Sequence, residues 1–97
     1  MDLVVLWSAD ADVQAAYEFQ EDIFGNGQKF LDRLDEAFGH LRQFPEMAPF
    51  FTRRYRRMLV PRFPYGIFYT VEARGIVVAA VMDLRQDPRV IMRRLKG

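Results

Sequence analysis

Residues 55–69, YRRMLVPRFPYGIFY, combine a strand pattern, turn residues and concentrated positive charge. The segment is rich in aromatic and β-branched residues, which predicts sheet rather than a disordered basic tail. Pro61 and Pro64 divide it, so we expect a strand over residues 55–60, a proline-bounded turn over 61–64 and a second strand over 65–72. The rest of the chain is expected to support these two strands.

Downstream, residues 73–75 (ARG) are expected to close a hairpin, and residues 76–82 (IVVAAVM) are apolar at nearly every position. Such a run predicts a central strand that helices cover on one side. Residues 83–87 then leave the sheet. Asp87 followed by Pro88 is typical of a helix N-cap with proline at the first helical position, which predicts a short basic helix toward Leu95.

Upstream, residues 3–7 (LVVLW) predict a short buried strand that Ser8 ends. Ser8 is expected to cap a first helix, and Asp10 and Asp12 place negative charge near the positive end of its dipole. The apolar face expected for this helix comprises Val13, Ala16, Ile23 and Phe24, with Tyr17 and Phe19 at its flanks. Residues 25–27 (GNG) break it.

A second helix is predicted over residues 28–44 by the i, i+4, i+7 spacing of Phe30, Leu34, Ala37 and Leu41, and Pro45 stops it. Two helices joined by a Gly-Asn-Gly turn predict an antiparallel hairpin that packs its apolar side on a sheet. The fold class is therefore α+β. We expect a β-α-α-β-β-β sandwich with the helix hairpin on a small, mainly antiparallel sheet, followed by a short C-terminal helix.

Length and composition limit the classes of function. The 97 residues are 51% apolar, which predicts a single domain over residues 1–97. The chain has no cysteine, which excludes disulfides and Cys-based zinc sites, and its one histidine, His40, is assigned no role, so no metal or cofactor is expected. No apolar run approaches the roughly 20 residues that span a bilayer. With an acidic N-terminus unlike a signal peptide, the sequence predicts a soluble cytoplasmic protein with no membrane partner.

The net charge of +1 conceals an asymmetry between the halves of the chain. Residues 1–50 hold three Lys or Arg against ten Asp or Glu, a net charge of −7, and residues 51–97 hold eleven against three, a net charge of +8. This polarity predicts that an anionic partner would orient the molecule. The alternative is a solvated basic strand whose arginine stems cover apolar neighbours.

Three segments carry a family resemblance: Tyr55-Arg56-Arg57, residues 65–71 (YGIFYTV) and residues 81–88 (VMDLRQDP). With the predicted element order, they make the chain resemble the RelE/ParE superfamily of toxins from bacterial type II toxin–antitoxin modules over nearly its whole length. The resemblance implies a growth-inhibiting toxin that a cognate antitoxin binds and neutralises in a hetero-oligomeric complex. It also implies a choice between a RelE-like branch, which cleaves mRNA on the ribosome, and a ParE-like branch, which inhibits DNA gyrase.

Metal-free RNA cleavage requires a group that accepts the 2'-OH proton, a group that protonates the leaving oxygen, and cations beside the phosphate. By resemblance, Arg56 and Arg57 lie near basic positions of the nuclease branch, and Arg85 matches its arginine after the last strand. Three positions depart from that branch. They are Gly66 in place of arginine, Asp83 in place of histidine, and Ile91 in place of a C-terminal acid/base residue.

The candidate target- or phosphate-binding residues are Arg56, Arg57, Arg62 and Arg85. Asp83 and Arg85 are catalytic candidates only if the chain is a nuclease. Asp83 would serve as a base if apolar surroundings raised its pKa, whereas a carboxylate beside Arg85 is more often an ion pair. Tyr55, Tyr65 and Tyr69 are candidates for stacking on bases, although aromatics at strand spacing are more often core residues or cross-strand pairs.

Three hypotheses follow. The departures at 66, 83 and 91 favour a ParE-like toxin that binds a macromolecular target, with DNA gyrase preferred, over an enzyme. The alternative is a metal-independent, ribosome-dependent mRNA endoribonuclease of the RelE-like kind, and the third is an inactive interaction domain that keeps the fold. Under both toxin hypotheses we expect an antitoxin whose apolar helix covers the helix hairpin or a sheet edge, with acidic residues facing the arginines.

Overall fold

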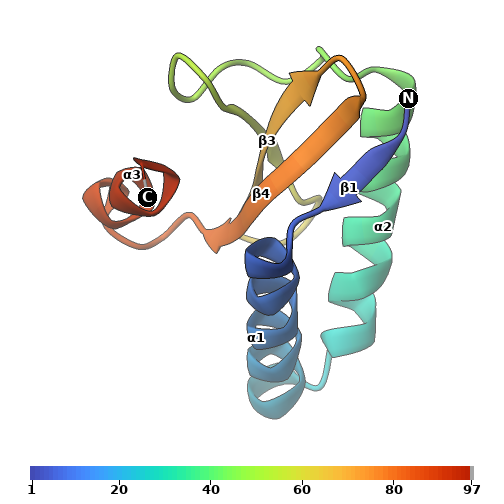
Figure 1. The fold of residues 1–97 in the computed structure, drawn as a ribbon. Helices are drawn as coiled ribbons and strands as arrows, with labels where there is room; N and C mark the ends of the chain where they lie inside the picture. Colours follow the sequence, from blue (N-terminus) through green and yellow to red (C-terminus); the bar gives the residue numbers. More distant parts are fainter. Residues whose placement is uncertain (97) are drawn as a thin grey trace.

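The computed structural model describes residues 1–96 and has the element order expected from the sequence. The elements are β1 (Leu3–Val5), α1 (Trp7–Phe24), α2 (Gly27–Gln43), β2 (Arg56–Leu59), β3 (Tyr65–Glu72), β4 (Gly75–Asp83) and α3 (Pro88–Lys96). The strand order is β1-β4-β3-β2, with β1 parallel to β4 and the other pairs antiparallel. Figure 1 shows the α1–α2 hairpin beside the sheet and α3 set apart from the hairpin. The predicted α+β fold is confirmed.

β4 is the central strand, as the apolar run predicted. Ile76 and Val78 pack toward the hairpin. Ala80 packs on the opposite side, because the pairing with β3 shifts between Phe68 and Tyr69 and leaves Ala79 as an extra residue that reverses the alternation. Gly75 begins the strand at φ 146°, and a Cβ there would lie 2.5 Å from the Asp2 carbonyl oxygen. The close approach lets the Ile76 amide donate to that oxygen at 2.8 Å, which starts the pairing of β1 with β4.

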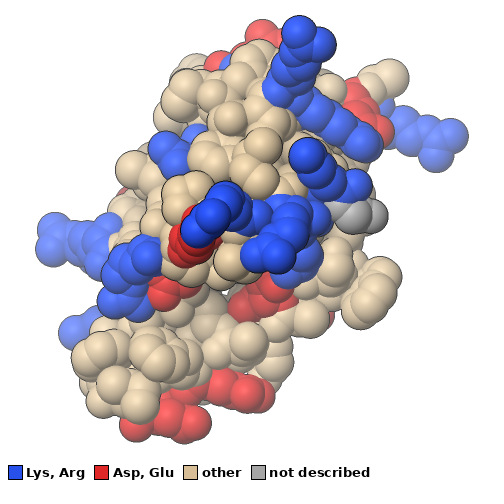
Figure 2. Space-filling view, turned by 90° about the vertical axis from the view of Figure 1, so that its left-hand side faces the viewer, with Lys and Arg blue, Asp and Glu red and all other residues tan. Residues whose placement is uncertain are grey.

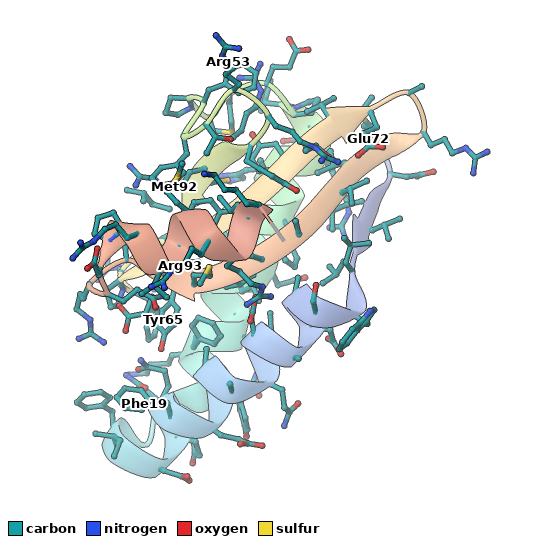
Figure 3. The ribbon with its side chains drawn as sticks, turned by 60° about the vertical axis from the view of Figure 1, so that its left-hand side comes forward. Phe19, Arg53, Tyr65, Glu72, Met92 and Arg93 are labelled. Atoms are coloured by element: carbon teal, nitrogen blue, oxygen red, sulfur yellow. The ribbon has the colours of Figure 1, made fainter. Side chains whose placement is uncertain are left out.

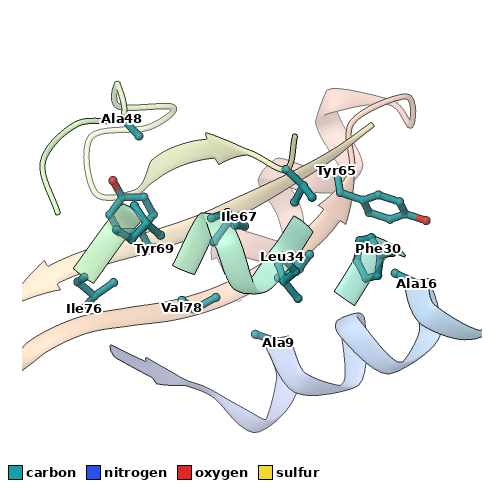
Figure 4. Packing of buried hydrophobic residues seen from close by; sticks show 14 residues of the cluster. Ala9, Ala16, Phe30, Leu34, Ala48, Tyr65, Ile67, Tyr69, Ile76 and Val78 are labelled. Atoms are coloured by element: carbon teal, nitrogen blue, oxygen red, sulfur yellow. The ribbon is translucent and has the colours of Figure 1, made fainter. Parts of the chain in front are cut away.

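The apolar face predicted for α2 is confirmed: Phe30, Leu34, Ala37 and Leu41 are all buried. Figure 4 shows Phe30 and Leu34 on the side of the sheet where Ile67 of β3 also points. Phe30 contacts the ring of Tyr65 with ring centroids 5.1 Å apart. The helix ends with a cap at Phe44, because Pro45 cannot extend it.

The start of α1 differs from the prediction. β1 ends at Val5, and Trp7 is the first residue of the helix, with 85% of its surface exposed. Leu6 is the N-cap, because its carbonyl accepts the Asp10 amide at 2.9 Å. The expectation that Ser8 caps the helix is therefore wrong, and its hydroxyl donates to the Ala79 carbonyl at 3.5 Å instead.

The apolar face predicted for α1 is only partly correct. Ala16 is buried as expected, but Ile23 and Phe24 are each 60% exposed. The buried positions are Ala9, Ala16 and Gln20. Figure 1 shows the reason, since the last turns of α1 extend below the end of the sheet and have no strand to cover them.

α3 packs on the side of the sheet opposite the hairpin through a second apolar cluster. Its buried members are Phe68, Ala80, Met82 and Ile91, with Phe51, Leu84 and Leu95 packed against them. The helix begins at Pro88, as predicted, and the Asp87 carboxylate accepts the Arg89 amide at 2.9 Å. Within residues 1–96, none of the helices is long and apolar enough to cross a membrane.

Candidate target-binding surface

The two arginines of β2 point to opposite faces of the sheet. Arg56 pairs with Tyr69 and Arg57 with Phe68, and neighbouring residues of a strand alternate in direction. Arg56 lies on the hairpin side, where its Nη1 donates to the Glu46 carbonyl at 3.0 Å and to the Ala48 carbonyl at 2.7 Å. It thus anchors the connection between α2 and β2, which is a structural role that the sequence did not reveal.

Arg57 lies on the side that carries α3. Its guanidinium carbon is 5.1 Å from the centre of the Phe51 ring, and Phe51 belongs to the cluster beneath α3. No ion pair engages Arg57 among residues 1–96. Stacking on an aromatic ring orients a guanidinium while leaving the N–H groups at its edge free to donate. Arg57 is therefore a preorganised cation.

Asp83 forms an ion pair with Arg85. The Arg85 Nη2 and Nε lie 2.7 Å from Oδ2 and 3.1 Å from Oδ1, and the Arg85 amide donates to Oδ1 at 2.8 Å. These hydrogen bonds from Arg85 hold the pKa of Asp83 below its ordinary value. The sequence left open whether Asp83 is a base with a raised pKa or a partner of Arg85 in an ion pair, and the structure shows the ion pair. A low pKa makes Asp83 a weak proton acceptor.

Tyr65 and Tyr69 are both buried in the core, which is the alternative to base stacking that strand spacing favoured. The Tyr69 hydroxyl donates to the Pro45 carbonyl at 2.9 Å, and burial raises the pKa of that hydroxyl. The Tyr65 hydroxyl oxygen accepts a hydrogen bond from the Gln20 side-chain nitrogen Nε2 at 3.5 Å. Of these three tyrosines, Tyr55 alone is partly exposed, and the Arg54 guanidinium carbon lies 5.3 Å from its ring centre.

Gly66 occupies a crowded position on the α3 side of the sheet. A Cβ there would lie 2.9 Å from Leu84 Cδ2 and 3.2 Å from Arg57 Cγ. A larger residue therefore requires Leu84 to move. The packing around Gly66 therefore disfavours an arginine at this position.

Arg62 is separated from the other candidate residues. It adopts φ 68° in the turn between β2 and β3 and lines a hollow with Lys29 and Arg33 beside the start of α2. The structure therefore does not gather Arg56, Arg57, Arg62 and Arg85 into one site. Of the four, Arg57 lies on the side of the sheet that carries α3, and Arg85 lies in the connection between β4 and α3.

Arg93 is not among the candidate residues named from the sequence, but the structure places it on the exposed side of α3. Ile91 of α3 is buried, and a residue two positions further along a helix points away from it, so helical spacing predicts an exposed Arg93. Arg93 borders a hollow of about 460 Å³ whose lining includes Tyr55, Ala79 and Ala80. Figure 3 shows Arg93 and Met92 on α3, with Arg53 on the loop above the helix.

We call Arg53, Arg57 and Arg93 the basic face. Figure 2, which looks at the side of the molecule that carries α3, shows Lys and Arg side chains over its middle and upper parts, with a few acidic side chains among them, and acidic side chains at the lower end, where α1 ends. The charge asymmetry of the sequence is therefore also an asymmetry in space. A target with negative charge would meet the α3 side first.

A strand, a helix hairpin, three strands and a closing helix, with arginines on the side that carries the closing helix, define the class of this protein as a small α+β domain. The chain belongs to the family described as the ParE toxin of the type II toxin–antitoxin system, parDE, whose model matches residues 3–88. The resemblance stated from the sequence is thereby confirmed.

Among solved structures, the chain is similar to one described as "Chromosomal ParDE TA system from P. aeruginosa". The two share 20% sequence identity with a TM-score of 0.78, and the match covers 88% of this chain and 97% of the other. No curated protein sequence matches the chain significantly.

Proposed function

We propose that the chain is a toxin that arrests growth by binding a macromolecular target, with DNA gyrase preferred, and that it acts as a single cytoplasmic domain. The observation that carries this proposal is that α3 packs over the face of the sheet opposite the hairpin. Phe68, Met82 and Ile91 bury each other beneath the helix, so this face of the sheet is closed by apolar packing. What remains for recognition is the outer surface of α3 and the arginines around it.

The nuclease alternative has less support. Its acid/base candidate, Asp83, is held in the ion pair with Arg85, and Gly66 leaves no cation where the nuclease branch has one. Arginine itself does not deprotonate in proteins, so Arg57 and Arg85 offer charge stabilisation without proton transfer.

We also propose a cognate antitoxin as partner, in a hetero-oligomeric complex. The helix hairpin supports this with an exposed apolar group at the end of α1, formed by Phe19, Ile23 and Phe24. The free edge of β1, where Val4 is exposed, offers a second place for an added segment. An amphipathic antitoxin helix would bury such residues, and its acidic side chains would neutralise the arginines.

The first experiment is expression with and without the neighbouring gene, and we expect growth arrest only without it. The second is a supercoiling assay with purified gyrase. No inhibition at a stoichiometric excess of the chain would remove gyrase from consideration.

Primer extension on translated mRNA decides the nuclease alternative, which requires new 5' ends that disappear in Arg85→Ala. Harmless expression of the chain alone would instead support an inactive interaction domain.

A further inference from the structure

The acidic residues that border α3 are each matched by an arginine. Asp83 pairs with Arg85 at 2.7 Å, Asp87 with Arg89 at 2.8 Å and Asp12 with Arg94 at 2.8 Å. None of these carboxylates is left to neutralise the basic face, in which Arg53, Arg57 and Arg93 form no ion pair with any residue of 1–96. Figure 2 shows further acidic side chains at the lower end of the view, where α1 ends.

The basic face has cations but few open aromatic rings. Arg57 covers Phe51, and Arg54 covers Tyr55. Proteins that bind single strands stack successive bases on exposed aromatic rings, whereas contacts to a duplex backbone need only correctly placed cations. The chemistry of this face therefore suits a phosphate backbone whose bases are already stacked.

We propose that the basic face binds the phosphate backbone of duplex DNA without sequence preference. The proposal rests on the proposed function, because a target such as gyrase holds duplex DNA beside its protein surface. In this arrangement the guanidinium edges of Arg57 and Arg93 donate to phosphate oxygens, and Arg53 extends the contact along the backbone. The acidic end of α1 points away from the DNA and fixes the orientation of the toxin.

Counterion release provides the test. A protein that neutralises three phosphates is expected to lose affinity with a slope of log K against log salt of about −3, because each B-DNA phosphate contributes roughly −0.9. We would measure fluorescence anisotropy of a short labelled duplex of mixed sequence with the purified chain across a salt series. Removing two contacts in Arg57→Ala/Arg93→Ala is expected to weaken binding by about tenfold or more at low salt and to reduce the slope by about two units.

The controls separate charge from folding. Arg42→Ala removes an exposed arginine of α2, which packs on the side of the sheet opposite α3, and is expected to leave the slope unchanged. Arg57→Lys/Arg93→Lys keeps both charges and is expected to keep the slope. Thermal unfolding of each variant checks that the fold is intact.

A slope near zero, or one that the double alanine variant leaves unchanged, would overturn the proposal. Tighter binding to single-stranded RNA than to duplex DNA would also overturn it, in favour of an RNA surface. Competition by polyglutamate as effective as that by duplex DNA of equal charge would overturn it in favour of an acidic protein segment. Because these measurements contain no gyrase, their failure is distinct from a negative supercoiling assay.

Discussion

Arg94 of α3 forms a two-pronged ion pair with Asp12 of α1. Its Nη1 lies 2.9 Å from Oδ1 and its Nη2 lies 2.8 Å from Oδ2, and Asp12 Oδ2 also accepts the Val81 amide at 3.0 Å. One carboxylate thus joins the first helix, the central strand and the last helix. The two side chains are only 17% and 33% exposed, for Asp12 and Arg94 respectively, so solvent screens the pair less than it would at the surface.

Asp12→Ala is expected to lower the free energy of unfolding by about 1–3 kcal/mol, because it leaves the Val81 amide and the Arg94 guanidinium without their acceptor. Chemical denaturation measures this loss, and hydrogen exchange should show reduced protection in α3. The matched control is Arg33→Ala, which breaks the exposed Arg33–Glu36 pair and is expected to cost below about 1 kcal/mol. Equal losses in the two variants would contradict a joining role for Asp12.

Gly66→Ala is expected to destabilise the protein by about 1–2 kcal/mol, because the new Cβ would meet Leu84 at 2.9 Å and force its side chain to move. In a Leu84→Ala background the same substitution should cost less, and denaturant unfolding of the four proteins measures the coupling. The control is Gly39→Ala in α2, where a Cβ meets nothing within 4 Å. That substitution is expected to stabilise the helix by roughly 0.5–1 kcal/mol. If Gly66→Ala were also stabilising, the crowding argument would fail.

The Asp83–Arg85 pair predicts a pH dependence of stability. The hydrogen bonds from Arg85 hold the pKa of Asp83 below its ordinary value of 3.8. A depressed carboxyl pKa means that the pair stabilises the fold above the unfolded value and that this stabilisation disappears as the pH falls through the folded value. We expect Asp83→Asn to flatten the loss of thermal stability below about pH 4, by a small amount because Arg85 is 59% exposed. A steeper acid loss in the variant would contradict this.

Local patterns were enough to predict the elements with the strongest periodicity. Helix α2 shows this best, since Phe30, Leu34, Ala37 and Leu41 face one way in sequence and in structure. The face of α1 was overestimated because helical spacing does not say where the sheet beneath a helix ends, and Ile23 and Phe24 lie beyond it. The Arg94–Asp12 pair joins residues 82 positions apart, and no local pattern contains that information.

The alternation of Arg56 and Arg57 was available from the sequence, because adjacent strand residues point to opposite faces. The expectation that both arginines bind the same target did not use this alternation. The structure assigns them to different neighbours: Arg56 to the carbonyls of Glu46 and Ala48, and Arg57 to the ring of Phe51 on the α3 side. This difference leads to the sharpest mutational contrast in the chain.

Arg56→Ala is expected to lower the free energy of unfolding by about 1–3 kcal/mol, because two carbonyls lose a charged donor and the Phe50 ring loses its cover. Arg57→Ala removes no hydrogen bond described within residues 1–96 and loses only the contact with the Phe51 ring, so it should lower stability by about 1 kcal/mol or less. If Arg57 contacts the target, its loss should nevertheless relieve growth arrest at equal protein level, whereas Arg33→Ala, which breaks only an exposed ion pair and has a similarly small expected effect on stability, should remain toxic. Denaturant unfolding together with growth curves at matched expression measures both quantities. Toxicity that followed stability alone across the three variants would show that Arg57 has no part in binding.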